Sequence, residues 1–254
     1  MKQRGWLLTL AYDGTDYCGW QRQENGPSVA AALEAVLEKI CGETVVAHGS
    51  SRTDAGVHAE GQRARVTLPA PWHGWELQRS LNSLLPPAIR VMALHACPEE
   101  FNPRIASIRK HYRYQWAWGP ACSPFHAATH EPVRKPLDVA AMRDAAARYL
   151  GKHDFSAFRG VSGLGRNPLR TIEESTLVQP APGILHYRVA GPGFMHQQVR
   201  IMAGTLLEVG AGARGAESVS ELLASGAAGA RDQAGHTAPA RGLVLERIDF
   251  ADRP

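Results

Sequence analysis

The side chains of this sequence with the clearest chemical potential lie in the stretch GSSRTDAGVHAEGQ, residues 49–62. Asp54 stands between glycines, and Arg52 precedes it by two positions. In an extended segment, side chains two residues apart point the same way, so the guanidinium would lie beside the carboxylate. A nearby cation lowers the pKa of a carboxyl group and so keeps it ionised. The stretch therefore predicts an ionised carboxylate on a glycine-flanked loop at the rim of a cleft, and the alternative is an ordinary turn with a solvated aspartate.

A second stretch, RKHYRYQWAW at residues 109–118, combines basic and aromatic residues. Because side chains alternate along a strand, its two faces differ. One face is predicted to carry Lys110, Tyr112, Tyr114, Trp116 and Trp118, and the other Arg109, His111, Arg113 and Gln115. Aromatic rings stack on unpaired RNA bases and cations meet phosphates, so the pattern is typical of RNA binding. The alternative, expected for most of these rings except Tyr112, is that they fill the core.

A third stretch, FMHQQVR, is predicted to open a helix over residues 194–210. His196 and Arg200 are four residues apart and would share one helical face. Arg200 stands between Val199 and Ile201, and a buried arginine there would need an anionic partner. A surface arginine on an amphipathic helix would explain the same spacing.

Other motif-like residues have ordinary explanations. His126 and His130 have the spacing of helical metal ligands, but prolines break their segment and the acidic residue of an HExxH motif is missing, so loop histidines are expected. Arg159, Arg166 and Arg170 could line a phosphate-binding rim or belong to a solvated loop. The sequence contains no P-loop, no GxGxxG after a strand and no GxSxG elbow.

The hydrophobic pattern of the first hundred residues predicts the order β-α-β-loop-β-α-β. Strands are expected at residues 6–14, 44–48, 62–68 and 89–97, and helices at residues 28–42 and 75–85. Ser28 is the expected N-cap of the first helix, and Gly42 is its stop signal. Two helices over one face of an antiparallel or mixed sheet are the natural packing for this order.

The second half restarts with the basic and aromatic strand. Strands are expected at residues 108–118, 171–179, 184–190 and 242–250, and helices at residues 137–155 and 194–210, with one short helix within residues 210–235. We place the boundary near residues 101–108, which divides the chain into residues 1–105 and residues 106–254.

The composition fits a folded, soluble protein. The chain has 254 residues, 44% of them hydrophobic, which allows a sizeable core and argues against disorder. A net charge of +4 is compatible with a polyanionic partner or with a solvated surface. Cys18, Cys41, Cys97 and Cys122 form no CxxC pair, so neither a zinc site nor a redox motif is predicted. No apolar run is long enough for a signal peptide or a membrane span, so we expect a cytoplasmic protein without membrane or metal.

Five segments together resemble the tRNA pseudouridine synthase A family. They are YDGTDYCGWQRQ, SSRTDAGVHAEGQ, the HYRY strand, FMHQQVR and the closing APARGLVLE, in the family's order. The resemblance covers residues 12–250, and residues 211–236 are its weakest part. It implies an α+β fold of two ferredoxin-like (RRM-like) halves joined into one extended, mostly antiparallel sheet. Helices would cover one face, and the active-site cleft would lie between the halves.

The resemblance also implies the activity and the partners. The enzyme would be an isomerase, an intramolecular transferase, that converts uridine to pseudouridine at positions 38, 39 and 40 in the anticodon stem-loop of tRNA. The N1–C1′ bond breaks, the uracil turns, and it rejoins the sugar through C5 without a cofactor. A homodimer in which one tRNA touches both subunits is implied as well.

The family's site residues fall on matching positions of this sequence. Asp54 would be the catalytic residue, in the N-terminal half, and Arg52 could fill the place that the flipped nucleotide leaves. Tyr112 would stack on the uracil or help to remove the C5 proton, Arg200 would pair with the aspartate, and Leu245 would line an apolar pocket. The candidates for the RNA-binding surface are Arg22, Arg79, Arg104, Arg109 and Arg166.

The chemistry explains why one carboxylate suffices. A hydrolytic glycosidase typically uses two carboxylates, whereas an isomerase that keeps the cleaved base has no water to activate. Whether Asp54 attacks C1′ or assists a glycal route by taking a 2′ proton stays open at this point. Two other functions compete: a non-catalytic RNA-binding module, and a metal-dependent nucleotide hydrolase using Asp54, His48 and His58, which lacks further acidic ligands.

Overall fold

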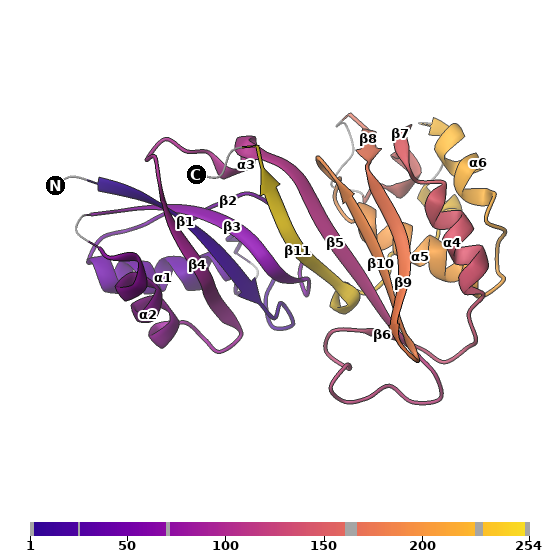
Figure 1. Cartoon of the computed structure of the whole chain (residues 1–254), viewed down its shortest axis with the longest axis horizontal. Helices are drawn as coiled ribbons and strands as arrows, with labels where there is room; N and C mark the ends of the chain where they lie inside the picture. The colour runs from indigo at the N-terminus through magenta and orange to yellow at the C-terminus, as the bar shows by residue number, and fades with distance from the viewer. Residues whose placement is uncertain (1–2, 25, 70–71, 161–166, 227–230, 252–254) are drawn as a thin grey trace. The chain divides into compact units, whose positions relative to one another are not determined.

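The protein combines helices and strands in two compact units (Figure 1). This computed structural model describes residues 3–24, 26–69, 72–160, 167–226 and 231–251. The first unit comprises Met1–Ile108 together with Leu245–Pro254, and the second comprises Arg109–Val244. The end of the chain therefore returns to the unit that its beginning forms.

The first unit has the predicted order of elements. These are β1 (Gln3–Tyr12), α1 (Val29–Cys41), β2 (His48–Gly49), β3 (His58–Pro69), α2 (Gly74–Leu84), β4 (Ile89–Cys97) and the short α3 (Pro103–Ala106). Strand β1 pairs antiparallel with both β3 and β4, and the closing strand β11 (Leu243–Phe250) lies next to β3. The strand expected at residues 44–48 is wrong in extent, because only β2 forms there and pairs with β3.

Helix α1 begins and ends where its sequence signals predict. The Ser28 side chain accepts a hydrogen bond from the Ala31 amide at 3.2 Å, which satisfies a donor that the helix leaves unpaired. Gly42 ends the helix with φ 74°, a left-handed conformation that favours glycine. Both expected caps are confirmed.

The core of this unit lies between its helices and one face of its sheet. Along β3, Gln62, Ala64, Val66 and Leu68 are buried, whereas the residues between them are only half-buried. This alternation is the period of two that a strand with one core-facing side requires. Helices α1 and α2 contact each other and lie together in Figure 1. The apolar stripes that they bury are Leu33, Val36 and Leu37 on α1, and Leu77 and Leu81 on α2.

The second unit is built from β5 (Ser107–Trp118) onward. Its further elements are β6 (Glu131–Val133), α4 (Val139–Ala147), β7 (Gly151–Asp154), β8 (Leu169–Ile172), β9 (Glu174–Ala181), β10 (Ile184–Gly191), α5 (Gln198–Gly210) and α6 (Ser218–Ala224). Strand β10 pairs antiparallel with β5 and β9, and β6 pairs parallel with β5. The short helix expected within residues 210–235 is α6.

The aromatic residues of β5 mostly fill the core. Tyr114 and Trp116 are completely buried, as the alternative interpretation of this strand expects. His111 and Gln115, on the opposite face by alternation, are buried as well. Both faces of β5 are therefore covered over much of its length, and most of this strand is no open platform for stacking RNA bases.

Two helix predictions need correction in the second unit. The helix expected at residues 137–155 ends with α4, because the following GKHD forms β7 and pairs with β8. The helix expected from residue 194 begins at Gln198, because Gln197 has φ 59° and the His196 carbonyl accepts a hydrogen bond from the Gly160 amide. His196 therefore precedes the helix, and it does not share a helical face with Arg200.

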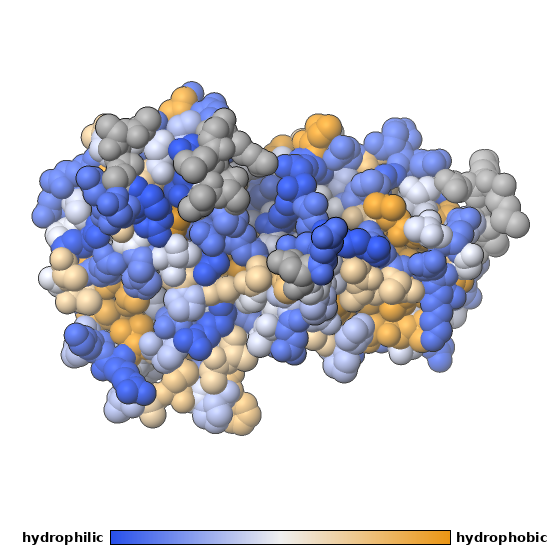
Figure 2. Space-filling model, turned by 180° about the vertical axis from the view of Figure 1, so that it is seen from behind, coloured by the Kyte–Doolittle hydropathy of each residue, from blue (hydrophilic) through white to orange (hydrophobic). Residues whose placement is uncertain are grey.

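On the face shown in Figure 2, both hydrophilic and hydrophobic side chains of the described residues reach the surface. Among the described residues, the most exposed large hydrophobic side chains are Phe125, Ile105 and Trp75. In the described part of the chain, no helix has both the length and the apolar character needed to cross a membrane.

Candidate active site

Residues 50–57 form the loop that joins β2 to β3, and buried polar groups fix its beginning. Ser50 donates from Oγ to the Pro103 carbonyl at 2.7 Å. Gln62 is completely buried on β3 and donates from Nε2 to the Ser51 carbonyl at 2.8 Å. Because buried polar groups are costly to leave unpaired, these bonds hold the loop in one position.

The middle of the loop is held by the YDGTDYCGW segment. The hydroxyl groups of Tyr12 and Thr53 lie 2.8 Å apart, and both side chains are buried. The Trp20 amide donates to the Thr53 carbonyl at 3.2 Å, and the Gly56 amide donates to the Tyr17 carbonyl at 3.0 Å. The segments YDGTDYCGWQRQ and SSRTDAGVHAEGQ therefore pack together, and the first supports the second.

Two glycines of the first motif are needed for this close approach. Gly19 has φ 92°, and a Cβ there would collide with the Thr53 carbonyl oxygen. A Cβ at Gly14 would collide with the Val57 carbonyl oxygen. Any side chain at either position would push the segment away from the loop.

The loop presents Arg52 and Asp54 on its less buried side. Ser51 and Thr53 are buried, Arg52 is exposed and Asp54 is half-buried. This alternation agrees with the spacing of two that places the guanidinium and the carboxylate on the same side. The inward residues Ser51 and Thr53 make anchoring contacts, and the two charged side chains belong to the residues that alternate with them.

His48 and His58 lie on the two strands that flank the loop, and His58 has protein partners there. Nδ1 of the buried His58 lies 3.1 Å from both the Gly14 amide and an Asp13 carboxylate oxygen. Burial on its own raises the pKa of Asp13, but hydrogen bonds from Thr15, together with the nearby His58, bring it below its ordinary value. His48 is exposed on β2. Within the described residues, no group of three or more His, Cys, Asp or Glu side chains could hold a metal ion.

In the second unit, Tyr112 lies on β5 opposite Val189 of β10. Its side chain is 7% exposed, and its ring meets Phe194 edge-to-face with the centroids 5.1 Å apart. Phe194 opens the FMHQQVR stretch, so this contact joins the tyrosine strand to the segment that carries Arg200. Burial raises the pKa of the neighbouring Tyr114, whose hydroxyl donates to the Pro239 carbonyl at 2.9 Å.

Arg200 lies in the first turn of α5 and is half-buried. Its Nε donates to the Ala238 carbonyl at 2.7 Å, and the Ala238 amide donates to the Arg200 carbonyl at 3.1 Å. Helix α5 buries residues on most of its circumference, so it is not the amphipathic surface helix of the alternative interpretation. Leu245, the remaining candidate, is completely buried on β11 in the first unit.

The other histidines with metal-like spacing lie in a loop, as expected. His126 and His130 belong to the turns between β5 and β6, and their rings are 4.5 Å apart. Burial, followed by the charges of His126 and Arg113, lowers the pKa of His130 to about 4. His130 is therefore a neutral, buried loop histidine at physiological pH.

Comparison with known proteins identifies the family. A family model described as tRNA pseudouridine synthase matches residues 145–251. The tRNA pseudouridine synthase A of Myxococcus xanthus is 44% identical over 247 residues, which cover 97% of this chain and 92% of that protein. The enzyme of the same name from Geobacter sp. (strain M21) is 40% identical, over 96% of this chain and 98% of that protein.

The chain belongs to the tRNA pseudouridine synthase A family. Among solved structures, a chain of the Cbf5-Nop10-Gar1 complex matches with a TM-score of 0.36 and 10% identity, over 96% of this chain and 50% of that chain. This likeness is too low to bear on the fold. The family relation therefore rests on the sequence relatives alone.

For a member of the tRNA pseudouridine synthase A family, the five arginines expected to contact RNA have different surroundings. Arg79 on α2 and Arg104 on α3 are exposed. Arg22 is exposed and lies 3.1 Å from a Glu34 carboxylate oxygen. The Arg109 guanidinium lies within 3.5 Å of two carboxylates, those of Glu173 and Glu174, which already balance its charge. Arg166 lies outside the described residues.

Sequence reasoning missed the residues that hold loop 50–57 in place. Tyr12 and Thr53 are far apart in the sequence, and their hydrogen bond depends on the tertiary fold. Gln62 could have been recognised from the sequence, because it is two residues from Ala64 and four from Val66 and so faces the same side of β3. A polar residue at a core-facing strand position needs a hydrogen-bond partner, and here that partner is the loop.

We expect Tyr12→Phe to loosen the loop. The change removes the hydroxyl that meets Thr53 and leaves a buried threonine with one partner fewer, which costs about 1–2 kcal/mol of the free energy of unfolding. Urea unfolding measures this loss, and a fall in the rate of tRNA modification should accompany it. Tyr17→Phe, which removes the same atom from a half-exposed neighbour, is the control. Equal stability of the two variants would contradict the role given to the Tyr12 hydroxyl.

Proposed function

We propose that the protein isomerises uridine to pseudouridine at positions 38, 39 and 40 in the anticodon stem-loop of tRNA. The observation that carries the proposal is the anchored loop 50–57, which buries Thr53 and leaves Arg52 and Asp54 on its open side. Family membership supports the reaction and its tRNA substrate. A loop fixed by buried bonds suits a nucleophile, because catalysis requires the reacting group to be held in position.

In the proposed mechanism, Asp54 is the one carboxylate that the reaction needs. It either attacks C1′ as the N1–C1′ bond breaks, or takes a 2′ proton on a glycal route. The uracil stays bound, turns, and bonds to C1′ through C5, while the C5 proton leaves and N1 gains a proton. Atoms balance without water, metal or redox partner, so neither a second carboxylate nor a cofactor is required.

The supporting roles fall to residues of both units. Tyr112 stacks on the uracil or helps to remove the C5 proton, and its nearly buried edge-to-face contact with Phe194 supports a fixed ring position. Arg200 pairs with the catalytic carboxylate, and Leu245 provides apolar lining. Arg52, which is exposed, takes the place of the flipped nucleotide. Exposed cations such as Arg22, Arg79 and Arg104 contact the tRNA backbone.

We further propose that the N-terminal half supplies the aspartate loop and the C-terminal half supplies the tyrosine strand and the arginine helix. The halves are ferredoxin-like and join in one sheet with the site between them. The order β1-α1-β2-β3-α2-β4 supports the ferredoxin-like topology proposed for the first half. A cross-link between cysteines placed at Arg52 and at Phe194 during turnover would test it, and failure to form the cross-link within an active enzyme would count against it.

The proposal also includes a homodimer in the cytoplasm, with one tRNA touching both subunits. Family membership and the tRNA substrate support it. Light scattering of the purified protein measures the mass directly. A monomer that modifies tRNA at full rate would refute this part while leaving the catalytic proposal intact.

The experiment that tests the activity uses an unmodified tRNA transcript with tritium at uracil C5. Pseudouridine formation replaces the C5 hydrogen, so the wild-type protein should release tritium to water, and mapping the product should locate the modified positions. Tight tRNA binding with no release from several transcripts would overturn the proposal in favour of a non-catalytic RNA-binding module.

A further inference from the structure

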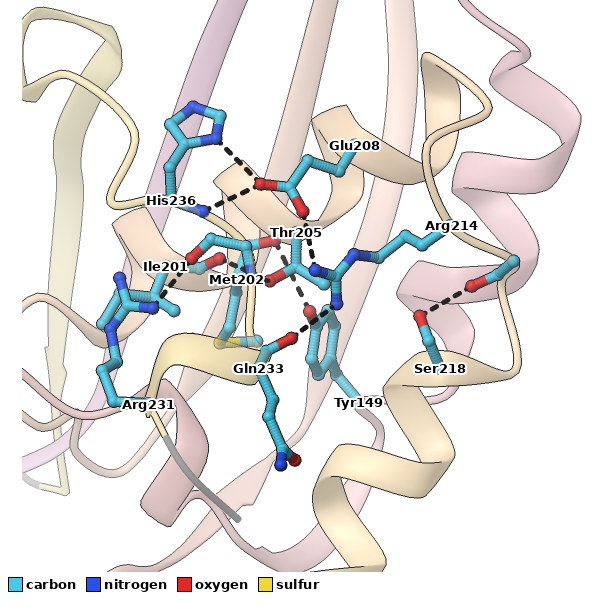
Figure 3. Close-up of polar contacts among 12 residues, drawn as sticks. Tyr149, Ile201, Met202, Thr205, Glu208, Arg214, Ser218, Arg231, Gln233 and His236 are labelled. Atoms are coloured by element: carbon cyan, nitrogen blue, oxygen red, sulfur yellow. Dashed lines mark hydrogen bonds and ion pairs between the residues drawn. The ribbon is translucent and has the colours of Figure 1, made fainter.

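Residues 233–238 form a segment without long regular structure that lies against helix α5 (Figure 3). Thr205 donates from Oγ1 to the Ile201 carbonyl and accepts from the Gly235 amide, both at 2.9 Å. The Ala238 amide then reaches the Arg200 carbonyl. Because higher residue numbers in the segment meet lower ones in the helix, the segment runs antiparallel to α5. We call residues 233–238 the docked segment.

Glu208 is the side chain that fastens the docked segment at its far end. Its Oε1 accepts from the His236 amide at 2.9 Å and lies 3.1 Å from His236 Nδ1. Its Oε2 lies 2.8 Å from Nη2 of Arg214, whose Nη1 donates to the Gln233 carbonyl at 3.0 Å. Figure 3 shows Glu208 at the centre of these contacts. One carboxylate thus holds two points of the docked segment, one directly and one through Arg214.

The helix and the docked segment also meet backbone to backbone. A Cβ at Gly204 would collide with the His236 carbonyl oxygen, and a Cβ at Gly235 would collide with backbone atoms of Thr205. Arg231 also holds the docked segment, because its Nη1 donates to the Gly235 carbonyl. Because the two backbones pack this closely, the docked segment cannot shift along α5 at one end without also moving at the other end.

The near end of the docked segment orients the proposed active-site arginine. Arg200, Gly204 and Glu208 are spaced by four residues and share one stripe of α5. The fully buried Ala238 presents its carbonyl to Arg200 Nε at 2.7 Å. With Nε committed, the guanidinium can meet a carboxylate only through its terminal nitrogens. The position of the Ala238 carbonyl therefore sets the direction in which Arg200 presents those nitrogens.

We propose that Glu208 is a positioning residue for Arg200, acting through the docked segment whose Ala238 carbonyl directs the guanidinium. This inference rests on the proposed function of Arg200. Eight residues of helix separate the two, which is about 12 Å along the axis, so Glu208 itself does not touch a uridine bound at Arg200. Arg214 and residues 233–236, which lie in the part of the sequence with the weakest resemblance, thereby gain a role in the site.

The contacts by which Glu208 holds the docked segment depend on pH, because they depend on the charge of its carboxylate. Burial on its own raises the pKa of Glu208, but hydrogen bonds from His236 and the charge of Arg214 bring it below its ordinary value of 4.5. A carboxyl with a lowered folded-state pKa stabilises the fold above its unfolded pKa, and this contribution is lost as pH falls through the folded pKa. The other groups that sense its charge are Arg231 and the buried Tyr149.

We therefore expect the stability difference between the wild type and Glu208→Gln to depend on pH. At about pH 7 the wild type should have the larger free energy of unfolding in urea, and the difference should shrink as the pH falls below the ordinary glutamate value of 4.5. A difference that stays constant down to about pH 3 would show that the carboxylate charge does not fasten the segment.

The positioning role is tested by kinetics in two backgrounds. Tritium release is measured at varied tRNA concentration for the wild type, Glu208→Ala, Arg200→Ala and the double variant. We expect Glu208→Ala to lower kcat by about 10-fold or more with little change in KM, since a misdirected group costs rate rather than binding. In the Arg200→Ala background the same change should cost almost nothing, because no guanidinium is left to direct.

The controls separate positioning from folding. Glu221→Ala removes an exposed carboxylate from α6 of the same unit and should leave kcat unchanged. Glu208→Gln, which keeps an acceptor for the His236 amide, should recover part of the rate, and it serves for the same test if Glu208→Ala does not fold. An equal loss in both backgrounds, wild-type kcat in folded Glu208→Ala, or wild-type kcat in Arg200→Ala would each overturn the inference. Failure of the proposed function is a separate result, because the wild type would then release no tritium.

Discussion

Asp54→Asn should lower the rate of tritium release from C5-labelled tRNA by a factor of about 10³ or more, while tRNA binding is retained. Removing the nucleophile of an enzyme typically costs this much or more, because the remaining groups bind the substrate but cannot begin the reaction. The amide has nearly the shape of the carboxylate, so the anchored loop should keep its conformation. Its anchors are Tyr12, Ser50 and Gln62, which contact the Thr53 hydroxyl, the Pro103 carbonyl and the Ser51 carbonyl.

The matched control is Glu60→Gln, the other carboxylate of the same stretch, which is exposed. If one carboxylate suffices for the isomerisation, this variant should retain the wild-type rate within a few-fold. Comparable losses in the two variants would point to a pair of carboxylates and hence to glycosidase-like chemistry. Full activity of Asp54→Asn would remove Asp54 from the mechanism altogether. Filter binding of the same tRNA should give similar dissociation constants for all three proteins.

The elements that could be predicted from the sequence are those that local signals define. Helix α1 has a serine cap, a glycine stop and an apolar stripe, and it forms where these lie. Helix α5 begins later than its pattern suggests because Gln197 adopts a left-handed conformation and the preceding carbonyl bonds to Gly160. Strand β7 exists because β8 pairs with it, and no window of sequence around GKHD contains that partner.

The candidate site also has a part that the sequence could predict and a part that it could not. The spacing of Arg52 and Asp54 indicated that both lie on one side of the loop, and the burial pattern agrees. The sequence did not indicate what holds the loop, because Tyr12 and Thr53 are separated by 41 positions. The fastening of the docked segment was equally hidden, since Glu208 and His236 are 28 positions apart. Contacts of this kind depend on the tertiary fold, so a local sequence pattern cannot predict them.

The surroundings of Arg200 suggest that its direction matters as much as its charge. A lysine could supply the charge at this position, but its ammonium has no planar fork and no Nε to bond the Ala238 carbonyl. The docked segment and helix α5 together fix one nitrogen of the guanidinium, which lowers the entropy lost when the others bind a carboxylate. A lysine variant therefore separates the contribution of orientation from that of charge.

Arg200→Ala should lower kcat by about 10²-fold, and Arg200→Lys should recover only a small part of that loss. The alanine variant removes the cation that would hold the catalytic carboxylate ionised and in place, an effect of the size seen when one charged active-site partner is lost. It also leaves the buried Ala238 carbonyl without its 2.7 Å donor, so thermal unfolding must accompany the kinetics. Arg143→Ala, an exposed arginine on α4 in the same unit, controls for the loss of one positive charge toward tRNA. Should Arg200→Lys match the wild type, charge alone would suffice, and the bond from Nε to the Ala238 carbonyl would be part of the fold rather than of catalysis.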